Sequence, residues 1–210
     1  MTQAGSEPVI TAEDEVVDLC RELIQIDTSN YGDDSGPGER RAAEYVAAKL
    51  AEVDLRPEIF ESRPGRASVI VRVPGEDQTR AALLIHGHLD VVPAEKSDWR
   101  VDPFSGEIEE SCVWGRGAID MKDMDAMTLA VVRQIVREGR RPARNLVLAF
   151  VADEEAGSGA GARWLVNTRP DLFEGCTEAI GEVGGFSYTI SDERRLYLIQ
   201  TAEKGMAWLR

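Results

Sequence analysis

Histidine and cysteine are scarce in this sequence, which has two histidines and three cysteines among 210 residues. Cys20, Cys112 and Cys176 are odd in number and widely spaced, so they do not form a disulfide framework and they favour a reducing compartment. No C-x-x-C pair is present, and two histidines are too few for a zinc finger.

Basic residues are also in deficit, with 24 Lys and Arg against 38 Asp and Glu and a formal net charge of -14. Such a surface repels phosphate backbones and anionic lipid headgroups, so neither nucleic acid nor membrane is expected as a partner. No run approaches the roughly 20 apolar residues that span a bilayer. The first fifteen residues lack the basic and apolar regions of a signal peptide. We expect a soluble, cytoplasmic protein.

Apolar residues make up 43% of the chain, which is enough for a core, and they alternate between helical and strand patterns. Thr11 precedes a helical pattern that ends near Ile24, as an N-cap does. Further helices are predicted over 39–51, 120–138 and 163–167, and strands over 58–61, 68–73, 81–86, 107–114, 145–152, 178–182, 196–201 and 206–210. This alternation predicts an α/β fold with a mixed, largely parallel sheet and helices on both faces.

Four polar clusters stand where predicted strands end, which is where ligands bind in open α/β sheets. They are His86 to Asp90, Gly115 to Asp123, Asp153 to Glu155, and Gly181 to Gly185. In the first, Asp90 follows His88 by two residues, a spacing that lets the carboxylate hold one imidazole nitrogen while the other meets a metal. In the third, three adjacent acids repel one another unless a cation or a shared proton relieves them.

Each cluster also has an ordinary structural interpretation. A histidine at a strand end is more often a structural hydrogen-bond donor, and Asp120 is equally well explained as a helix N-cap. Asp153 to Glu155 fit a solvated loop, and Glu182 taken by itself is an ordinary acidic residue. Gly157 to Ala162 fit the G-x-G-x-x-A pattern of dinucleotide-binding loops, but the acids at 153 to 155 repel a pyrophosphate there. No nucleophile elbow is present, so covalent catalysis is disfavoured.

Taken in order, these pieces resemble one known family. The motifs are His88-x-Asp90-Val91-Val92-Pro93, Trp99 with Asp102-Pro103-Phe104, Gly115-Arg116-Gly117-x-x-Asp120-Met121-Lys122, Glu154-Glu155, and Glu182. They are similar to those of the co-catalytic zinc peptidases, which include acetylornithine deacetylase, succinyl-diaminopimelate desuccinylase, aminoacylase, carnosinase and glutamate-releasing carboxypeptidases such as carboxypeptidase G. The resemblance runs from the first helix to Trp208.

The resemblance implies a role for each residue. His88 and Glu182 would bind the first metal, Glu155 the second, and Asp120 would bridge them. Asp90 would orient His88, and Glu154 would be the general base. The implied cofactor is Zn²⁺, two ions per complete site, with Co²⁺ or Mn²⁺ as substitutes. His86 is implied to be a neighbour of the site and not a ligand.

Two features depart from the family pattern. The family's second metal takes one more histidine, and no histidine follows His88. Family members also insert a lid domain, and residues 203–210 resemble its first strand. A smaller departure is Asp123, which stands where relatives commonly have glycine. We therefore expect residues 1–202 to be part of a zinc aminopeptidase-like catalytic domain, cut before the lid, with a homodimer only through that lid.

The leading hypothesis is a metal-dependent hydrolase of amide bonds in small N-acyl amino acids or short peptides. The alternative is a catalytically silent metal-binding or interaction protein that lacks the late histidine and the lid. A plain acidic interaction domain is the third hypothesis. The substrate side chain, and the choice between deacetylase, dipeptidase and carboxypeptidase, are left open by the sequence.

Overall fold

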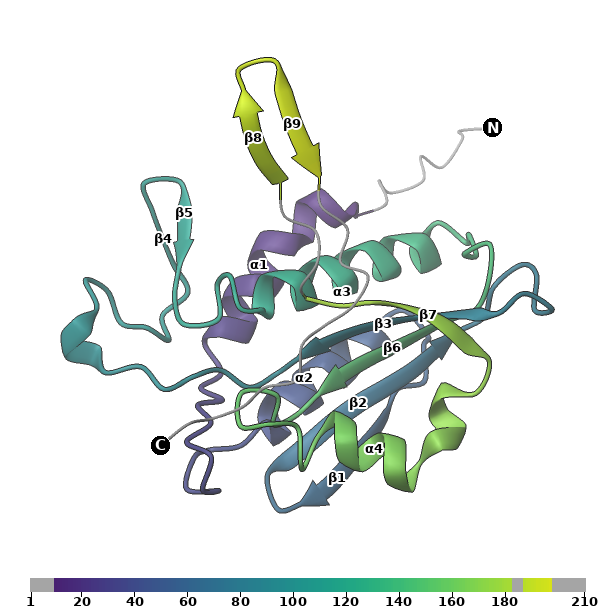
Figure 1. Cartoon of the computed structure of the whole chain (residues 1–210), viewed down its shortest axis with the longest axis horizontal. Helices are drawn as coiled ribbons and strands as arrows, with labels where there is room; N and C mark the ends of the chain where they lie inside the picture. The colour runs from purple at the N-terminus through teal and green to yellow at the C-terminus, as the bar shows by residue number, and fades with distance from the viewer. Residues whose placement is uncertain (1–9, 183–186, 198–210) are drawn as a thin grey trace, which may run out of the picture.

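A five-stranded sheet is the centre of the computed structural model, which describes residues 10–182 and 187–197. The strands lie in the order β1 (Glu58–Arg63), β2 (Arg66–Val73), β6 (Leu146–Val151), β3 (Ala82–His88) and β7 (Cys176–Ile180). β2 is antiparallel to both of its neighbours, whereas β6, β3 and β7 are parallel to one another (Figure 1). β2 alone therefore runs against the other strands of this sheet, and the predicted mixed, largely parallel α/β sheet is confirmed.

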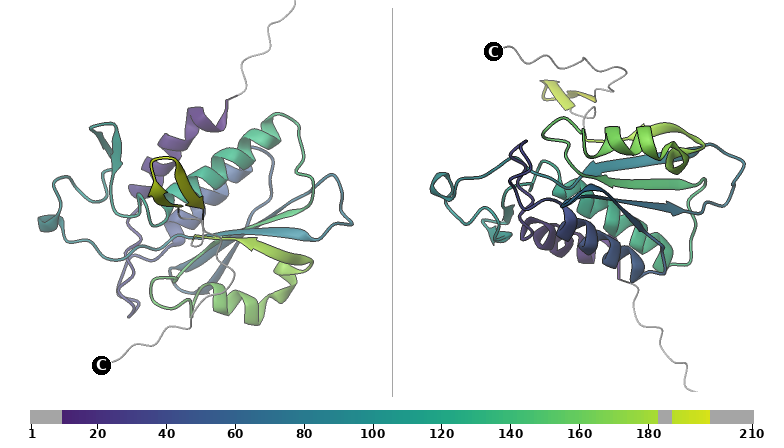
Figure 2. Two further views of the ribbon diagram at one scale, coloured as in Figure 1. Left: turned by 45° about the horizontal axis from the view of Figure 1, so that its top comes forward. Right: turned by 90° about the horizontal axis from the view of Figure 1, so that it is seen from below.

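Helices cover both faces of this sheet, as predicted (Figure 2). One face carries α1 (Ala12–Ile24), α2 (Arg40–Ala51) and α3 (Lys122–Arg137). The other carries α4 (Ala162–Thr168) and the short 3-10 helix η2 (Pro170–Phe173). The Thr11 hydroxyl accepts a hydrogen bond from the Asp14 amide, and the Asp14 carboxylate accepts from the Thr11 amide. This capping box starts α1 at the predicted residue.

The core divides in two because successive side chains of a strand point to opposite faces. Val69 and Val71 of β2 pack with the helices α1 to α3, whereas Ile70 between them packs with Leu165 of α4. Every residue of β6 is buried. Its continuous apolar sequence correctly predicted a strand covered on both faces.

Two short hairpins stand apart from the central sheet. β4 (Glu107–Glu109) pairs with β5 (Cys112–Trp114), so the range 107–114 that was predicted to hold one strand holds both arms of a short hairpin. β8 (Ser187–Ser191) pairs with β9 (Arg194–Tyr197), and β8 was not predicted. The strand predicted over 196–201 is described only at its first two residues, which lie at the end of β9. The strand predicted over 206–210 and the domain boundary at 202 lie outside the described residues.

A 3-10 helix η1 (Lys96–Asp98) lies in the long segment between β3 and β4. Within residues 10–182 and 187–197, no helix is both long and apolar enough to cross a lipid bilayer. Because β3, β6 and β7 are parallel, their carboxyl ends meet at one edge of the sheet. His88, Glu154, Glu155 and Glu182 lie at or just after these three ends, and Asp120 lies just before α3.

Candidate metal centre

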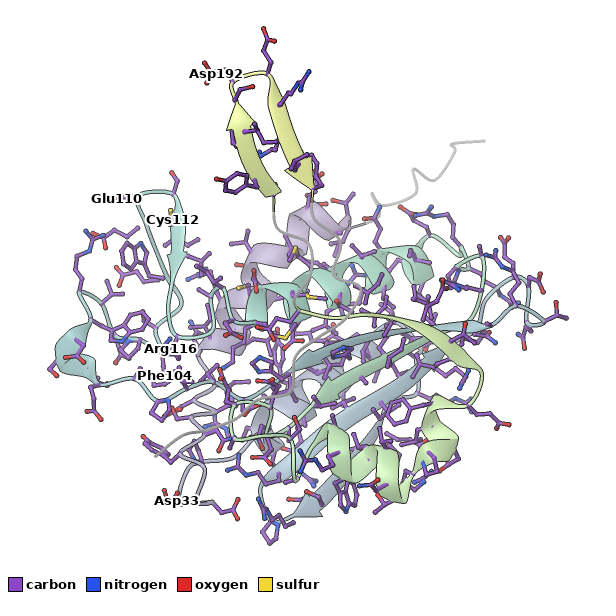
Figure 3. The ribbon with its side chains drawn as sticks, viewed as in Figure 1. Asp33, Phe104, Glu110, Cys112, Arg116 and Asp192 are labelled. Atoms are coloured by element: carbon purple, nitrogen blue, oxygen red, sulfur yellow. The ribbon has the colours of Figure 1, made fainter. Side chains whose placement is uncertain are left out.

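Four segments bring polar side chains to one edge of the sheet. His88 is the last residue of β3 and pairs with Val151, the last residue of β6. Glu154 and Glu155 follow β6 within a few residues, and Glu182 follows β7. Asp120 stands just before the first turn of α3. The segment between β5 and α3 that ends there also carries Arg116, which is labelled in Figure 3. Residues nearly a hundred positions apart therefore meet in one place.

The distances from one histidine nitrogen define this cluster. His88 Nε2 lies 3.0 Å from Asp120 Oδ1, 3.6 Å from Glu182 Oε2 and 3.9 Å from Glu154 Oε2. Two sets have ligand atoms within 4.8 Å of one another, namely His88 with Asp120 and Glu155, and His88 with Glu154 and Glu182. The structure thus brings together all five residues predicted as metal ligands or general base.

The surroundings of His88 leave one ring nitrogen for a metal. Nδ1 lies 2.9 Å from the Asp90 carbonyl oxygen, which can only accept, so Nδ1 carries a proton and Nε2 faces the acids. The Asp90 carboxylate is farther away, with Oδ1 3.5 Å from Nδ1. Burial lowers the pKa of His88, but the hydrogen bond and charge of Asp90 outweigh it and raise the pKa to about 10. Without metal the ring is therefore protonated at neutral pH.

The Asp90 carboxylate also holds the segment after β6. It is fully buried, and it accepts hydrogen bonds from the Glu154 amide at 3.0 Å and the Glu155 amide at 3.0 Å. Asn30 Nδ2 donates a third bond to it at 2.8 Å. Burial raises the pKa of Asp90, but its hydrogen bonds from His88 and Asn30 outweigh burial and lower it. Asp90 stays ionised and fixes the backbone that carries Glu154 and Glu155.

The remaining acids are crowded together. Burial, followed by the hydrogen bond and charge of Asp120, raises the pKa of Glu182 to about 7. Burial and the charge of Asp120 also raise the pKa of Glu155. A divalent cation relieves such repulsion, and one imidazole nitrogen with several carboxylate oxygens is a donor set that suits Zn²⁺ and Mn²⁺. The residues present therefore fit a metal ion.

Two hollows adjoin the cluster. One of about 700 Å³ is lined by Asp120, Trp99 and Arg116 among others, and the Arg116 guanidinium lies 5.2 Å over the Trp99 ring. The other, of about 550 Å³, is lined by Glu154, Glu155, Asn30 and Tyr31 among others. A small molecule can thus approach the cluster from either hollow.

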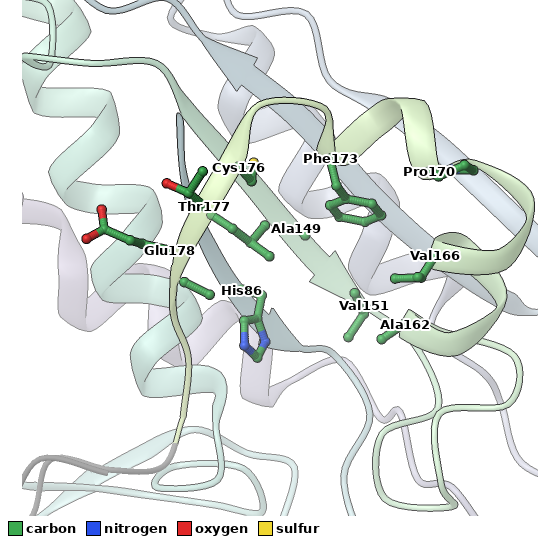
Figure 4. A pocket seen from close by; sticks show the side chains of 12 residues that line it. His86, Ala149, Val151, Ala162, Val166, Pro170, Phe173, Cys176, Thr177 and Glu178 are labelled. Atoms are coloured by element: carbon green, nitrogen blue, oxygen red, sulfur yellow. The ribbon is translucent and has the colours of Figure 1, made fainter. Parts of the chain in front are cut away.

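His86 and the glycine loop lie outside both ligand sets. His86 points into an apolar hollow of about 480 Å³ beside α4, together with Val166 and Phe173 (Figure 4). In the loop over 157–162, the Ala160 amide donates to Asp153 Oδ2 at 2.8 Å, so this amide is bound to the chain's own carboxylate. That no nucleotide binds there stays a prediction.

Sequence reasoning missed Asn30, Arg66 and Glu39, which form a buried polar network behind the cluster. Arg66 Nη1 donates to Glu39 Oε1 at 2.6 Å, and Arg66 Nη2 donates to Asn30 Oδ1 at 2.8 Å. The one local signal was the charge of Arg66, two residues before the strand predicted over 68–73. No spacing in the sequence connects it to Asn30.

Comparison with known proteins identifies relatives of the chain. A sequence profile described as peptidase family M20/M25/M40 matches residues 84–195. Aminoacylase-1 of Dictyostelium discoideum is 35% identical over 158 residues, which are 74% of this chain and 38% of that protein. Aminoacylase-1 of Homo sapiens is 32% identical over 173 residues, which are 82% of this chain and 40% of that protein.

Solved structures show the same fold. Human carnosine dipeptidase 1 matches with a TM-score of 0.69 and 24% identity over 83% of this chain and 40% of that chain. The M20 family metallo-carboxypeptidase Sso-CP2 from Sulfolobus solfataricus matches with a TM-score of 0.70 and 22% identity over 82% of this chain and 38% of that chain. The present chain spans about two fifths of the length of these relatives.

Proposed function

Because the chain belongs to the peptidase family M20/M25/M40, we propose that it forms the metal site of a hydrolase that cleaves amide bonds in N-acyl amino acids or short peptides. The observation that carries the proposal is the meeting of His88, Asp120, Glu155 and Glu182 at one sheet edge. Relatives named aminoacylase and carnosine dipeptidase support these two substrate classes.

The proposed roles are those that the family resemblance implies for the residues of the cluster. His88 and Glu182 would hold one divalent cation and Glu155 a second, and Asp120 would be shared between them. We propose zinc for both, with cobalt or manganese as substitutes. When bound, the pair supplies a Lewis acid for the substrate carbonyl and lowers the pKa of water.

Glu154 is the proposed general base. Its carboxylate takes a proton from the attacking water, whose oxygen forms a bond to the amide carbon. As the carbon–nitrogen bond breaks, Glu154 delivers that proton to the leaving amine. The segment that carries it is held by Asp90, so the carboxylate starts from a fixed backbone position.

A second candidate function follows from the histidine count. The 210 residues have two histidines, and His86 belongs to neither ligand set. A chain with His88 as its one imidazole ligand favours a single bound cation. The alternative is therefore a metal-binding or interaction protein without turnover.

Glu154→Gln separates metal binding from catalysis. We expect the variant to retain the zinc content of the parent chain, because Glu154 is not a proposed ligand. Hydrolysis of N-acetyl amino acids and dipeptides should fall by about 10²–10⁴-fold, the usual contribution of a general base. Zinc is measured by elemental analysis and turnover by release of the free amine.

Glu76→Gln is the matched control, because Glu76 is exposed and lies just past β2, away from the edge that carries the cluster. It should change neither zinc content nor rate. An unchanged rate in Glu154→Gln would refute Glu154 as the base. Zinc uptake by the parent chain without any turnover would favour the silent alternative.

A further inference from the structure

A continuous line of buried hydrogen bonds joins α2 and β2 to the metal site. It begins with Glu39 at the start of α2, passes through Arg66 at the start of β2, and reaches Asn30. Asn30 Nδ2 then donates to Asp90 Oδ2 at 2.8 Å and to Asp153 Oδ1 at 3.1 Å. Asn30 is 5% exposed and Arg66 is 3% exposed, so water does not compete for these bonds.

Arg66 settles which way the Asn30 amide points. A guanidinium has donors and no acceptor, so the amide atom that faces it must be the oxygen. Gly32 also donates its amide to Asn30 Oδ1, at 3.0 Å. With the oxygen engaged on this side, the NH₂ group must face the two carboxylates. A flipped amide would put an oxygen against two anions.

The two carboxylates that Asn30 binds belong to different strand ends. Asp90 follows β3 and Asp153 follows β6. Asp90 in turn accepts the amides of Glu154 and Glu155, and Asp153 accepts the amide of Ala160. Asp90 and Asp153 thus hold the segment after β6, which bears Glu154 and Glu155. Both of these acids accept hydrogen bonds from the side-chain amide of Asn30.

We propose that Asn30, oriented by Arg66, is a positioning residue that holds Asp90 and Asp153 together and so sets the place of Glu154 and Glu155. This assignment rests on the proposed function for its consequence in catalysis. Its structural content, that the donated bonds of Asn30 fix the segment after β6, holds in the absence of metal.

The first test therefore uses the metal-free chain. Asn30→Asp keeps the shape and the acceptor for Arg66 but loses both donated bonds, whereas Asn30→Ala loses the side chain without adding charge. We expect amide hydrogen exchange at Glu154 and Glu155 to rise at least tenfold in both variants, relative to Leu148 within β6. General destabilisation would raise the exchange rate at Leu148 by the same factor. Unchanged exchange at Glu154 and Glu155 would overturn the proposal.

Asn145→Ala is the control. Asn145 lies just before the first residue of β6, at the end of the strand away from the cluster. Its Oδ1 accepts a hydrogen bond from the Gly75 amide at 2.9 Å. It is thus an asparagine that bonds a backbone group of the same sheet. We expect it to lower the free energy of unfolding while the exchange at Glu154 and Glu155, relative to Leu148, stays as in the parent chain.

The second test measures Co²⁺ binding by titration calorimetry and by the visible absorption of the bound ion. Both Asn30 variants should bind Co²⁺ about 10-fold more weakly, the lower end of the cost of losing a direct partner of a metal ligand, because Asn30 acts on the ligands through Asp90. Asn145→Ala should bind as the parent does. Parent affinity in both Asn30 variants would overturn the role of Asn30 toward the metal. A parent chain without Co²⁺ binding would refute the proposed function, while the exchange result would still decide the positioning role.

Discussion

Glu182 makes the stability of the metal-free chain depend on pH. Burial and Asp120 raise the pKa of this carboxyl from its ordinary 4.5 to about 7, so the folded chain holds the proton more tightly than the unfolded chain. The free energy of unfolding should therefore fall as pH rises from 4.5 to 7, and Glu182 adds no further slope outside that window. Urea unfolding in the presence of a chelator measures the slope.

Glu182→Gln isolates this contribution, because glutamine has nearly the same shape and does not titrate. Its unfolding curves should lose part of the decline between pH 5 and 7, and parallel pH profiles for parent and variant would contradict the prediction. Bound zinc should reverse the direction in which the free energy of unfolding changes with pH, since a cation binds the deprotonated carboxylate. Zinc affinity should thus rise with pH over the same window.

At the scale of single residues, sequence reasoning found the side chains that a motif marks and missed those that only the fold brings together. His88, Asp120 and Glu154 stand in recognisable patterns at strand ends. Asn30 meets Asp90 across 60 positions and Asp153 across 123 positions, and Arg66 reaches Asn30 across 36. Such partners depend on sheet order, which no local spacing shows.

At the scale of elements, the close approach of β3 to α3 depends on Gly87. A Cβ atom at this position would lie 2.2 Å from Asp125 Oδ1 and 3.1 Å from Met121 Cε. Asp125 is buried against the strand and has little room to move. We expect Gly87→Ala to lower the free energy of unfolding by about 1–3 kcal/mol, the usual cost of overpacking. Urea unfolding measures it.

A double-mutant cycle tests that cause. Asp125→Ala removes the atom that a Cβ at Gly87 would strike, so Gly87→Ala should cost less in that background. Gly159→Ala is the control, because its nearest neighbour would be Asp153 Oδ2 at 3.8 Å, an ordinary contact. Equal costs of Gly87→Ala in both backgrounds would mean that the clash with Asp125 is not the reason.

Elements with a local signal begin and end within one or two residues of the prediction, whereas β7 is displaced as a whole by two residues and β8 was missed. α1 starts at its capping box, and β6 follows its apolar run. β7 was predicted over 178–182 but spans Cys176–Ile180, because its register is set by pairing with β3 through an irregularity at Ala82. β8 was not predicted, although Tyr188 and Ile190 alternate with polar residues in this short and almost wholly exposed strand.

At the scale of the whole molecule, two opposing forces act on association between copies of the chain. The apolar hollow beside α4 and the strand β7, which lies at the edge of the sheet in the described residues, favour it, and the net charge of -14 resists it. Val166 in this hollow is 56% exposed, and Ile180 on β7 is 50% exposed. Exposed apolar patches and free strand edges favour self-association, whereas like charge resists it. The balance between these two forces should depend on salt.

We therefore expect the chain to self-associate more strongly as the salt concentration rises, because the screening length shortens from about 30 Å at 0.01 M to about 10 Å at 0.1 M. Val166→Lys should weaken association at every salt concentration. Val131→Lys makes the same change of charge on α3, on the opposite face, at a residue that is 50% exposed. Sedimentation velocity compares the three proteins. If both lysine variants weaken association equally, the effect belongs to the loss of exposed apolar surface anywhere on the molecule and the face beside α4 has no special part; if Val166→Lys acts alone, the face beside α4 is the surface through which copies of this chain meet.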